Sequence, residues 1–304
     1  MTQARSDNGT VPIAVTMGEP AGIGGEIALR AWLHRHDLTP PFFLIDDVNR
    51  LQALAGHLEL TCAITPITAP QEAAGAFKHS VPVLPLDASV QPGWGTPNPG
   101  NAQAVVQSII CAANLVQSGE AAAMVTNPIQ KSTLYDAGFS HPGHTEFLAD
   151  QANMLSAPVM MLACKALRVV PVSIHLSLSD AIAGLTKEKI IHCGRATAMA
   201  LHRDFGIANP RLAVAGLNPH AGENGHLGRE EIDIIAPAVS HLASEDIRID
   251  GPFPADTLFH PEARRHYDAV LCMYHDQALI PLKTIDFEGG VNLTLGLPYV
   301  RTSP

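Results

Sequence analysis

The sequence lacks the features that mark disulfide-stabilised, membrane-spanning and nucleic-acid-binding proteins. Its five cysteines are scattered over 304 residues, are odd in number and include no CxxC pair, so neither a disulfide framework nor a thiolate zinc site is expected. The formal net charge of -10 argues against a nucleic-acid-binding surface. No segment has the unbroken apolar length of a membrane span, and residues 1–12 lack the charged-then-apolar layout of a signal peptide. We therefore expect a cytoplasmic protein with neither nucleic acid nor a membrane as partner.

The sequence does contain abundant apolar residues, arranged in alternating strand-like and helix-like segments. With 304 residues, 46% of them hydrophobic, the chain is long enough for two domains that share an interface. Residues 12–17 resemble a strand before a Gly-rich turn and a helix, and residues 186–206 form a long amphipathic helix before the strand at 211–220. This alternation predicts an α/β fold. Residues 158–164 and 167–175 are expected to pair within it as an antiparallel hairpin.

Three histidines, His175, His220 and His275, each stand at the end of an apolar run typical of a buried strand. The runs are LRVVPVSIH, RLAVAGLNPH and DAVLCMYH. Ligands of open α/β sheets sit beyond the carboxyl ends of strands, so the three imidazoles are expected to converge. Three neutral imidazoles with open coordination positions would form a catalytic metal site. A strand-end histidine is also an ordinary structural hydrogen-bonding residue, and the residues alone leave both interpretations open.

Polar residues elsewhere indicate an anion-binding function. In the string GHTE, Thr145 is a natural helix N-cap with His144 beside it, and the free amides behind a cap attract anions. The alternative is an ordinary capped helix. Lys283, Asn292 and Arg301 lie in otherwise apolar sequence, where a buried cation needs an anionic partner. That partner is either an internal carboxylate or a phosphate or carboxylate of a substrate.

The Gly-rich turn GEPAGIGGE near the start has no specific meaning by itself. It lacks the Lys-Ser/Thr pair of a Walker A loop and does not contain GxGxxG in register. It indicates only that a helix begins close to a ligand or to another piece of backbone.

Seven ordered motifs stand out from about residue 12 to the last residue. They are TMGEPAGIGGE, NPIQK, GHTEF, GLNPHAGE, GPFPADTLF, MYHDQALIPLK and VNLTLGLPYVRTS. Together they resemble the family of the 4-hydroxythreonine-4-phosphate dehydrogenases (PdxA) of pyridoxal phosphate biosynthesis. The fold of that family is similar to that of isocitrate and isopropylmalate dehydrogenases, a two-domain α/β/α architecture with the active site in the interdomain cleft, and its members are homodimers.

The resemblance implies a division of the chain and a role for each candidate residue. Residues 1–127 plus 265–304 would form an outer domain with part of the cofactor site, and residues 128–264 a central domain with the dimer interface. The metal ligands would be His175, His220 and His275, contributed to a shared site by both subunits. The substrate would be bound by His144, Thr145, Lys283, Asn292 and Arg301, with Asp256 and Asp276 as candidates for proton handling or for orienting the metal ligands.

The implied reaction is the oxidation of 4-phosphooxy-L-threonine by NAD or NADP, with one divalent ion (Zn, Mg or Co) at each site. The β-keto acid formed, 2-amino-3-oxo-4-phosphooxybutanoate, would lose CO₂ to give 3-amino-2-oxopropyl phosphate. A divalent ion on the alcohol oxygen would lower its pKa and later stabilise the enolate.

The sequence departs from the family pattern at a few places. The family commonly has Pro at Gly25 and Gly at Ala278. Its members continue past RTSP with a DHGTA-like string and a final helix beside the dinucleotide, which lie outside the sequence as read.

Other functions stay open on the residues alone. The nearest is a dehydrogenase of the same superfamily that acts on 4-phospho-D-threonate, 4-phospho-D-erythronate or a cyclic diol acid. A metal-dependent hydrolase is a second, although the histidines do not have the spacing of HExxH. A non-catalytic binder of small anions is a third.

Overall fold

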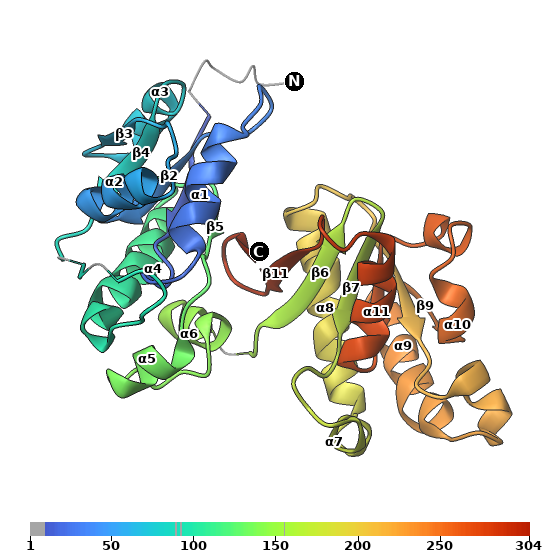
Figure 1. Ribbon diagram of the computed structural model, residues 1–304. Helices are drawn as coiled ribbons and strands as arrows, with labels where there is room; N and C mark the ends of the chain where they lie inside the picture. Colours follow the sequence, from blue (N-terminus) through green and yellow to red (C-terminus); the bar gives the residue numbers. More distant parts are fainter. Residues whose placement is uncertain (1–9, 89, 92, 155) are drawn as a thin grey trace. The chain divides into compact units, whose positions relative to one another are not determined.

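The chain folds into two compact units (Figure 1). The first is coloured blue to green apart from its dark red C-terminal segment, and the second is yellow-green to red. The computed structural model describes residues 10–88, 90–91, 93–154 and 156–304. Unit 1 comprises Met1–Leu155 and Leu297–Pro304, and unit 2 comprises Ser156–Gly296. Most of the segment on which the expectation about a signal peptide rests, residues 1–9, lies outside the described residues. Among those described, none of the helices has both the length and the apolar character needed to cross a membrane.

The domain boundaries differ from the expected ones. Residues 128–155 belong to unit 1, and residues 265–296 belong to unit 2. Residues 265–296 belong to unit 2 because the strand Ala269–Cys272 is hydrogen-bonded on both sides to strands of that unit. The predicted α/β class with two units is confirmed.

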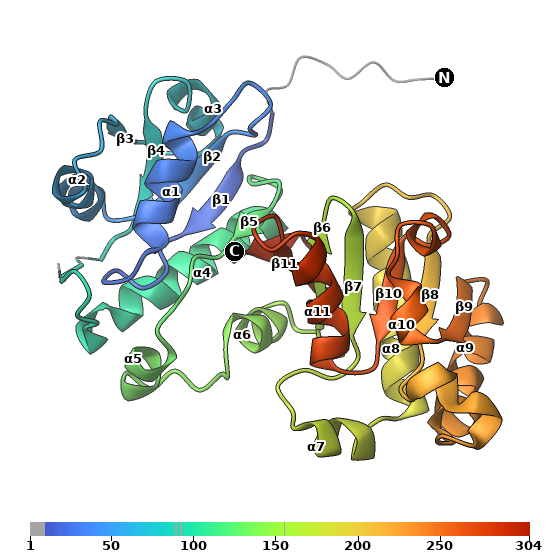
Figure 2. The same ribbon diagram turned by 45° about the vertical axis from the view of Figure 1, so that its right-hand side comes forward.

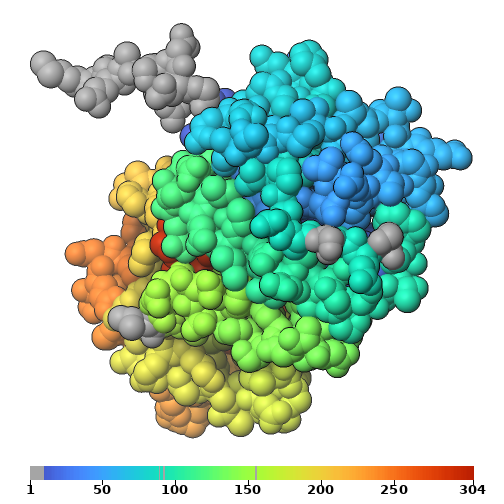
Figure 3. Space-filling view, turned by 90° about the vertical axis from the view of Figure 1, so that its left-hand side faces the viewer, coloured from blue at the N-terminus to red at the C-terminus, as the bar shows by residue number. Residues whose placement is uncertain are grey.

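Unit 1 is built on parallel strands in the order β3-β4-β2-β1-β5-β12. Alternate side chains of each strand point to opposite faces: Phe43 and Ile45 pack against α4, whereas Phe42 and Leu44 pack against α1 and α2. Unit 1 is therefore an α/β/α sandwich, and its described residues before Leu155 are coloured blue to green in Figure 3. Its strands are β1 (Ile13–Thr16), β2 (Phe42–Asp46), β3 (Ile64–Pro66), β4 (Val81–Pro85), β5 (Met124–Val125) and β12 (Arg301–Ser303). Its helices are α1 (Gly24–Leu33), α2 (Val48–His57), α3 (Ala73–Ala76), α4 (Ala102–Gln117), α5 (Lys131–Asp136) and α6 (His144–Gln151), with short 3₁₀ turns at Pro70–Glu72 and Pro99–Asn101.

Unit 2 has the strand order β11-β6-β7-β10-β8-β9. Strand β6 is antiparallel to both β7 and β11, so the hairpin expected from the sequence is confirmed, and the strands from β7 to β9 are parallel. The strands are β6 (Val159–Cys164), β7 (Leu167–Pro171), β8 (Arg211–Ala215), β9 (Arg248–Phe253), β10 (Ala269–Cys272) and β11 (Val291–Leu295). The helices are α7 (Leu178–Ala183), α8 (Lys187–Arg203), α9 (Ala236–Ala243), α10 (Ala255–Leu258) and α11 (His275–Ile285), with a 3₁₀ turn at Ala263–Arg265.

Helices cover both faces of the unit 2 sheet. Val170 and Leu271 pack against α8 and α9, whereas their neighbours Val169 and Val270 pack against α10 and α11. Figure 2 shows α11 beside β7. Helix α8 follows the predicted amphipathic segment closely, with Thr186 as an N-cap that accepts a hydrogen bond from the amide of Lys189.

Candidate functional site

The three histidines lie beyond the ends of three adjacent strands of unit 2. His175 follows β7, His275 follows β10 and His220 follows β8, and these strands lie side by side in the order β7-β10-β8. They run parallel, so their carboxyl ends share one edge of the sheet. The interpretation of the three apolar runs as neighbouring buried strands is therefore correct, and the edge is the one where α/β proteins bind ligands.

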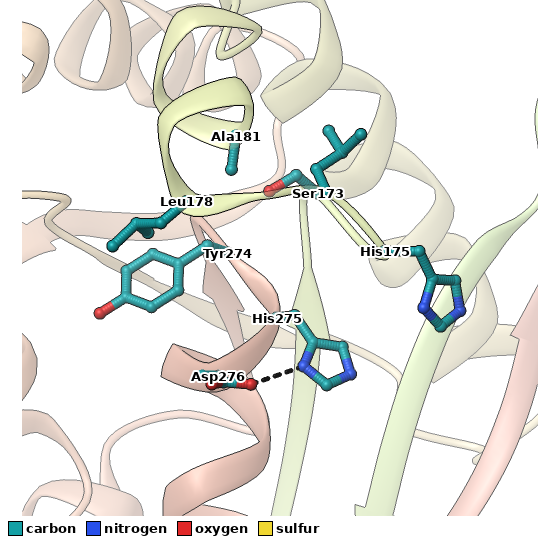
Figure 4. Close-up of a pocket in the computed structure, with 8 residues that line it drawn as sticks. Ser173, His175, Leu178, Ala181, Tyr274, His275 and Asp276 are labelled. Atoms are coloured by element: carbon teal, nitrogen blue, oxygen red, sulfur yellow. Dashed lines mark hydrogen bonds and ion pairs between the residues drawn. The ribbon is translucent and has the colours of Figure 1, made fainter.

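His175 and His275 face one hollow of about 220 Å³ (Figure 4). Their ring centroids are 6.0 Å apart. The Nδ1 atom of His275 lies 2.7 Å from an Asp276 carboxylate oxygen, a contact that fixes the ring and leaves Nε2 for another partner. His175 has a left-handed backbone with φ of 53°. The lining residues of this hollow are Ser173, His175, Leu176, Leu178, Ala181, Tyr274, His275 and Asp276.

His220 does not join the other two histidines within one chain. It is absent from the residues that line the hollow, and no three His, Cys, Asp or Glu side chains of the described residues are close enough together to hold a metal ion. The expectation that three strand ends bring three imidazoles together is thus wrong for a single chain. The physical reason is local: the chain leaves β8 through a left-handed turn, Pro219–Gly225, that contains His220.

Asp256 and Asp276 line a second hollow of unit 2, about 460 Å³ in volume. Its other walls are mostly apolar and include Phe259, Ile280 and Pro281. Asp276 therefore belongs to both hollows of unit 2 and touches the His275 ring. Both aspartates thus line one hollow, and their roles in proton handling stay predictions.

In unit 1, His144 is the first residue of α6, and its Nε2 atom is buried without a hydrogen-bond partner. Burial, together with the positive charges of Arg301 and Lys131, lowers the pKa of His144 to about 3. The ring is therefore neutral at ordinary pH, and its buried nitrogen can bind an incoming group. Thr145 is not the N-cap that the sequence suggests, because Gly143 occupies that position in an extended conformation.

Arg301, on β12, is 4% exposed. Its Nε and Nη2 atoms donate to the hydroxyl of Thr126 at 3.1 and 2.5 Å. Burial lowers the pKa of Arg301 to about 10, while Tyr299 and Glu146 act in the opposite direction. A buried guanidinium beside a neutral imidazole is suited to binding an anion.

Lys131 is the residue that the sequence reasoning missed. It is the first residue of α5 and belongs to the string NPIQK. A Cβ atom added to Gly143 would lie 3.8 Å from its ammonium nitrogen, so Lys131 reaches the N-terminus of α6 beside His144. The available signal was the string NPIQK itself, in which Lys131 stands three residues after Pro128.

The remaining candidates, Lys283 and Asn292, belong to unit 2. The ammonium of Lys283, in the last turn of α11, lies 5.5 Å from the centre of the Phe287 ring. Asn292 lies on β11 and pairs with Leu162 of β6. Each is thus fixed by a regular element, and their roles toward a substrate stay predictions.

Other residues of the protein lie against the Gly-rich turn before α1. The Glu19 carboxylate accepts from the amide of Ala21 at 3.1 Å, and the Glu19 carbonyl accepts from the amide of Gly22 at 2.9 Å. A Cβ atom on Gly24 would lie 2.8 Å from the Cβ atom of Asn127. Of the two interpretations of this turn, close approach to another piece of backbone accounts for its glycines. A buried carboxylate on its first amides does not suit a pyrophosphate.

Comparisons with known proteins agree with the motifs. The model of a family described as pyridoxal phosphate biosynthetic protein PdxA matches residues 38–304. A 4-hydroxythreonine-4-phosphate dehydrogenase of Caulobacter vibrioides is 52% identical over 298 residues, which cover 96% of this chain and 88% of that protein. One from Bradyrhizobium diazoefficiens is 50% identical over 305 residues, with the same coverage of 96% and 88%.

Solved structures give the same result. The crystal structure of 4-hydroxythreonine-4-phosphate dehydrogenase from Klebsiella pneumoniae superposes with a TM-score of 0.87 at 36% identity, covering 96% of this chain and 90% of that one. A terephthalate 1,2-cis-dihydrodiol dehydrogenase from Burkholderia xenovorans is less similar, with a TM-score of 0.67 at 26% identity, covering 96% and 88%. The chain belongs to the family described as pyridoxal phosphate biosynthetic protein PdxA.

Proposed function

We propose that this protein oxidises 4-phosphooxy-L-threonine with NAD or NADP as a 4-hydroxythreonine-4-phosphate dehydrogenase. The observation that carries the proposal is family membership over nearly the whole chain, together with two structural features suited to the reaction. One is the pair of imidazoles at the strand ends of unit 2. The other is the cluster of Lys131, His144 and Arg301 in unit 1. A cytoplasmic location is part of the proposal and rests on the sequence alone.

His175, His275 and His220 would hold one divalent ion, Zn, Mg or Co. The donor set fits, because His275 is already oriented through its Nδ1 contact with Asp276, as ligating histidines commonly are. When bound, such an ion lowers the pKa of an alcohol and stabilises negative charge on oxygen.

The separation of His220 from the other two histidines supports a site shared between subunits. One chain would supply His175 and His275, and the partner subunit of a homodimer would supply its own His220. An isologous dimer forms two such sites by symmetry.

The other residues bind the substrate and handle its protons. His144, Lys131 and Arg301 provide an N–H donor and two cations for the phosphate or carboxylate, and the N-terminus of α6 with Thr145 adds amides. Lys283 and Asn292 would orient the remaining polar groups of the substrate. Asp256 and Asp276, at the second hollow, are candidates to accept the proton of the alcohol.

The direct test is formation of reduced nicotinamide from 4-phosphooxy-L-threonine, with and without chelator. Parallel reactions with 4-phospho-D-threonate and with a cis-dihydrodiol acid distinguish the proposed substrate from those of the other superfamily members. Turnover of 4-phosphooxy-L-threonine alone, abolished by chelator and restored by added metal, is expected. The absence of reduced cofactor with every substrate would refute the dehydrogenase proposal.

Mixed dimers test the shared site. Neither H175A nor H220A should be active alone, whereas refolded mixtures should regain about a quarter of the wild-type sites, because half of the dimers are mixed and each has one intact site. A site within one chain would give no recovery at any mixing ratio. The variant H79A replaces an exposed histidine and serves as the matched control, with unchanged activity expected.

If Lys131, His144 and Arg301 bind an anionic group of the substrate, substitutions of Lys131 should raise the KM to different degrees. The variant K131M should raise the KM for the phosphorylated substrate about 10- to 150-fold, the effect of losing a charged hydrogen bond of about 1.5–3 kcal/mol. The variant K131R, which keeps the charge, should lose much less. An unchanged KM in K131M would remove Lys131 from the site.

A further inference from the structure

The turn that contains His220 has an unusual backbone. His220, Ala221, Gly222, Glu223 and Asn224 have φ values between 42° and 80°. Only one of the five is glycine, and the other residue types are disfavoured in this left-handed region. Such a conformation persists only where the surrounding structure holds it.

The side chain of Glu231 supplies the contacts that hold it. Its Oε1 atom accepts hydrogen bonds from the backbone amides of Leu217 and Asn218, both at 2.7 Å. Its Oε2 atom accepts from the side-chain amide of Asn218 at 2.9 Å. Glu231 is 3% exposed and begins the short π-helical segment Glu231–Ile235. Segments of π-helix are rare and occur frequently at functional sites.

The Glu231 carboxylate packs closely against Gly216, which precedes His220, and against Gly222, which follows it. A Cβ atom on Gly216 would lie 3.2 Å from Oε1, and one on Gly222 would lie 2.6 Å from Oε2. Burying a carboxylate costs free energy unless hydrogen bonds or an opposite charge offset the lost hydration. In the part of the chain that the structure describes, the hydrogen-bond donors to Glu231 all come from Leu217 and Asn218, the residues that lead into the turn.

We propose that Glu231 is a positioning residue that fixes His220 in the orientation needed to bind the metal ion. It acts through the backbone of the turn and does not touch the imidazole. This inference rests on the metal site of the proposed function and adds to it a residue that does not line the hollow of His175 and His275.

The variant E231Q tests the inference with little change of volume. One oxygen of glutamine can still accept from the two backbone amides, but its NH₂ group meets the NH₂ group of Asn218, and two donors cannot bond. The matched control is E230Q. Glu230 also accepts from the Asn218 side chain, at 2.6 Å, but accepts nothing from the amides of Leu217 and Asn218.

The first measurement is titration of the full-length protein with Co²⁺, followed by its absorption spectrum. The E231Q variant is expected to bind Co²⁺ about 10- to 100-fold more weakly than wild type, the usual effect of removing a group that orients a ligand. Wild-type affinity is expected for E230Q. Equal affinity of E231Q and wild type would overturn the inference, whereas failure of the wild type to bind any metal would overturn the proposed function instead.

The second measurement assigns the defect to His220. In mixed dimers, E231Q should restore Co²⁺ binding and activity with H175A, because one site then has all its groups intact. It should restore neither with H220A. Recovery with both partners, or with H220A alone, would contradict a role through His220.

A second variant, in the residue that leads into the turn, keeps the inference testable if E231Q does not fold. The variant N218A removes the hydrogen bond that the Asn218 side chain donates to Glu231, and it leaves the backbone amides in place. It should show the same pattern of complementation with a smaller loss of Co²⁺ affinity. Complementation of H220A by N218A would contradict the inference even if E231Q did not fold.

Discussion

Replacing His144 with glutamine is expected to make the folded protein less sensitive to acid. Burial and the charges of Arg301 and Lys131 lower the pKa of His144 from 6.5 to about 3. Between these values the unfolded chain binds a proton that the folded chain does not. The free energy of unfolding therefore falls as the pH falls through this range, and the contribution is absent above pH 6.5.

The size of the change in the free energy of unfolding follows from the difference between the pH of the experiment and the pKa of His144 in the unfolded chain. At about pH 5 the unfolded imidazole is protonated and the folded one is neutral, so His144 costs about 2 kcal/mol of stability relative to neutral pH. Glutamine keeps an uncharged N–H donor and does not titrate. The variant should thus lose about 2 kcal/mol less than wild type between pH 7.5 and pH 5.

Urea unfolding of both proteins at the two pH values measures this difference, since other titrating groups contribute equally to both. Replacement of the exposed His79 by glutamine provides the control for loss of an imidazole that is not buried. Identical pH dependence of H144Q and wild type would refute the reasoning, because it would mean that His144 takes up its proton in the folded state. Inorganic phosphate should reduce the effect, since an anion beside the ring favours the imidazolium.

Three further variants test other contacts. D276N weakens the partner of the His275 ring and should lower Co²⁺ affinity at least about tenfold in a spectroscopic titration; an unchanged affinity would exclude an orienting role. D46A leaves the guanidinium of Arg50 buried without its partner and should lower the free energy of unfolding by about 3–5 kcal/mol in urea; a loss below about 1 kcal/mol would contradict this. G18A places a Cβ atom 2.7 Å from Asn127 at a φ of 69° and should lower the melting temperature, whereas an unchanged value in calorimetry would show that the turn adapts.

The local pattern of the sequence predicted the elements and the edge of the sheet where the candidate site lies. Strand runs and helix periods depend on neighbouring residues, so the strands before His175, His220 and His275 and the β6–β7 hairpin were readable without a structure. The Gly-rich turn was also correctly treated as having no specific meaning by itself. The prediction of Thr145 as the N-cap of α6 was wrong, because Gly143 occupies that position in an extended conformation.

Domain membership was decided by pairing that is remote in the sequence. Strand β10 lies between β7 and β8 and therefore belongs to unit 2, although the chain passes through β9 before reaching it. Sequence order does not reveal which strands become neighbours, because hydrogen bonds between strands form wherever the crossovers place them.

The sequence by itself determined the family, the α/β class and the residue types available for chemistry, since these depend on composition, period and motif. Only the tertiary structure brought Lys131 beside His144, left a histidine nitrogen buried without a partner, and set Glu231 against the turn of His220. It also separated His220 from the other two imidazoles within one chain. The physical reason is that burial, charge proximity and hydrogen bonding act through space, whereas a sequence pattern reports only on residues a few positions apart.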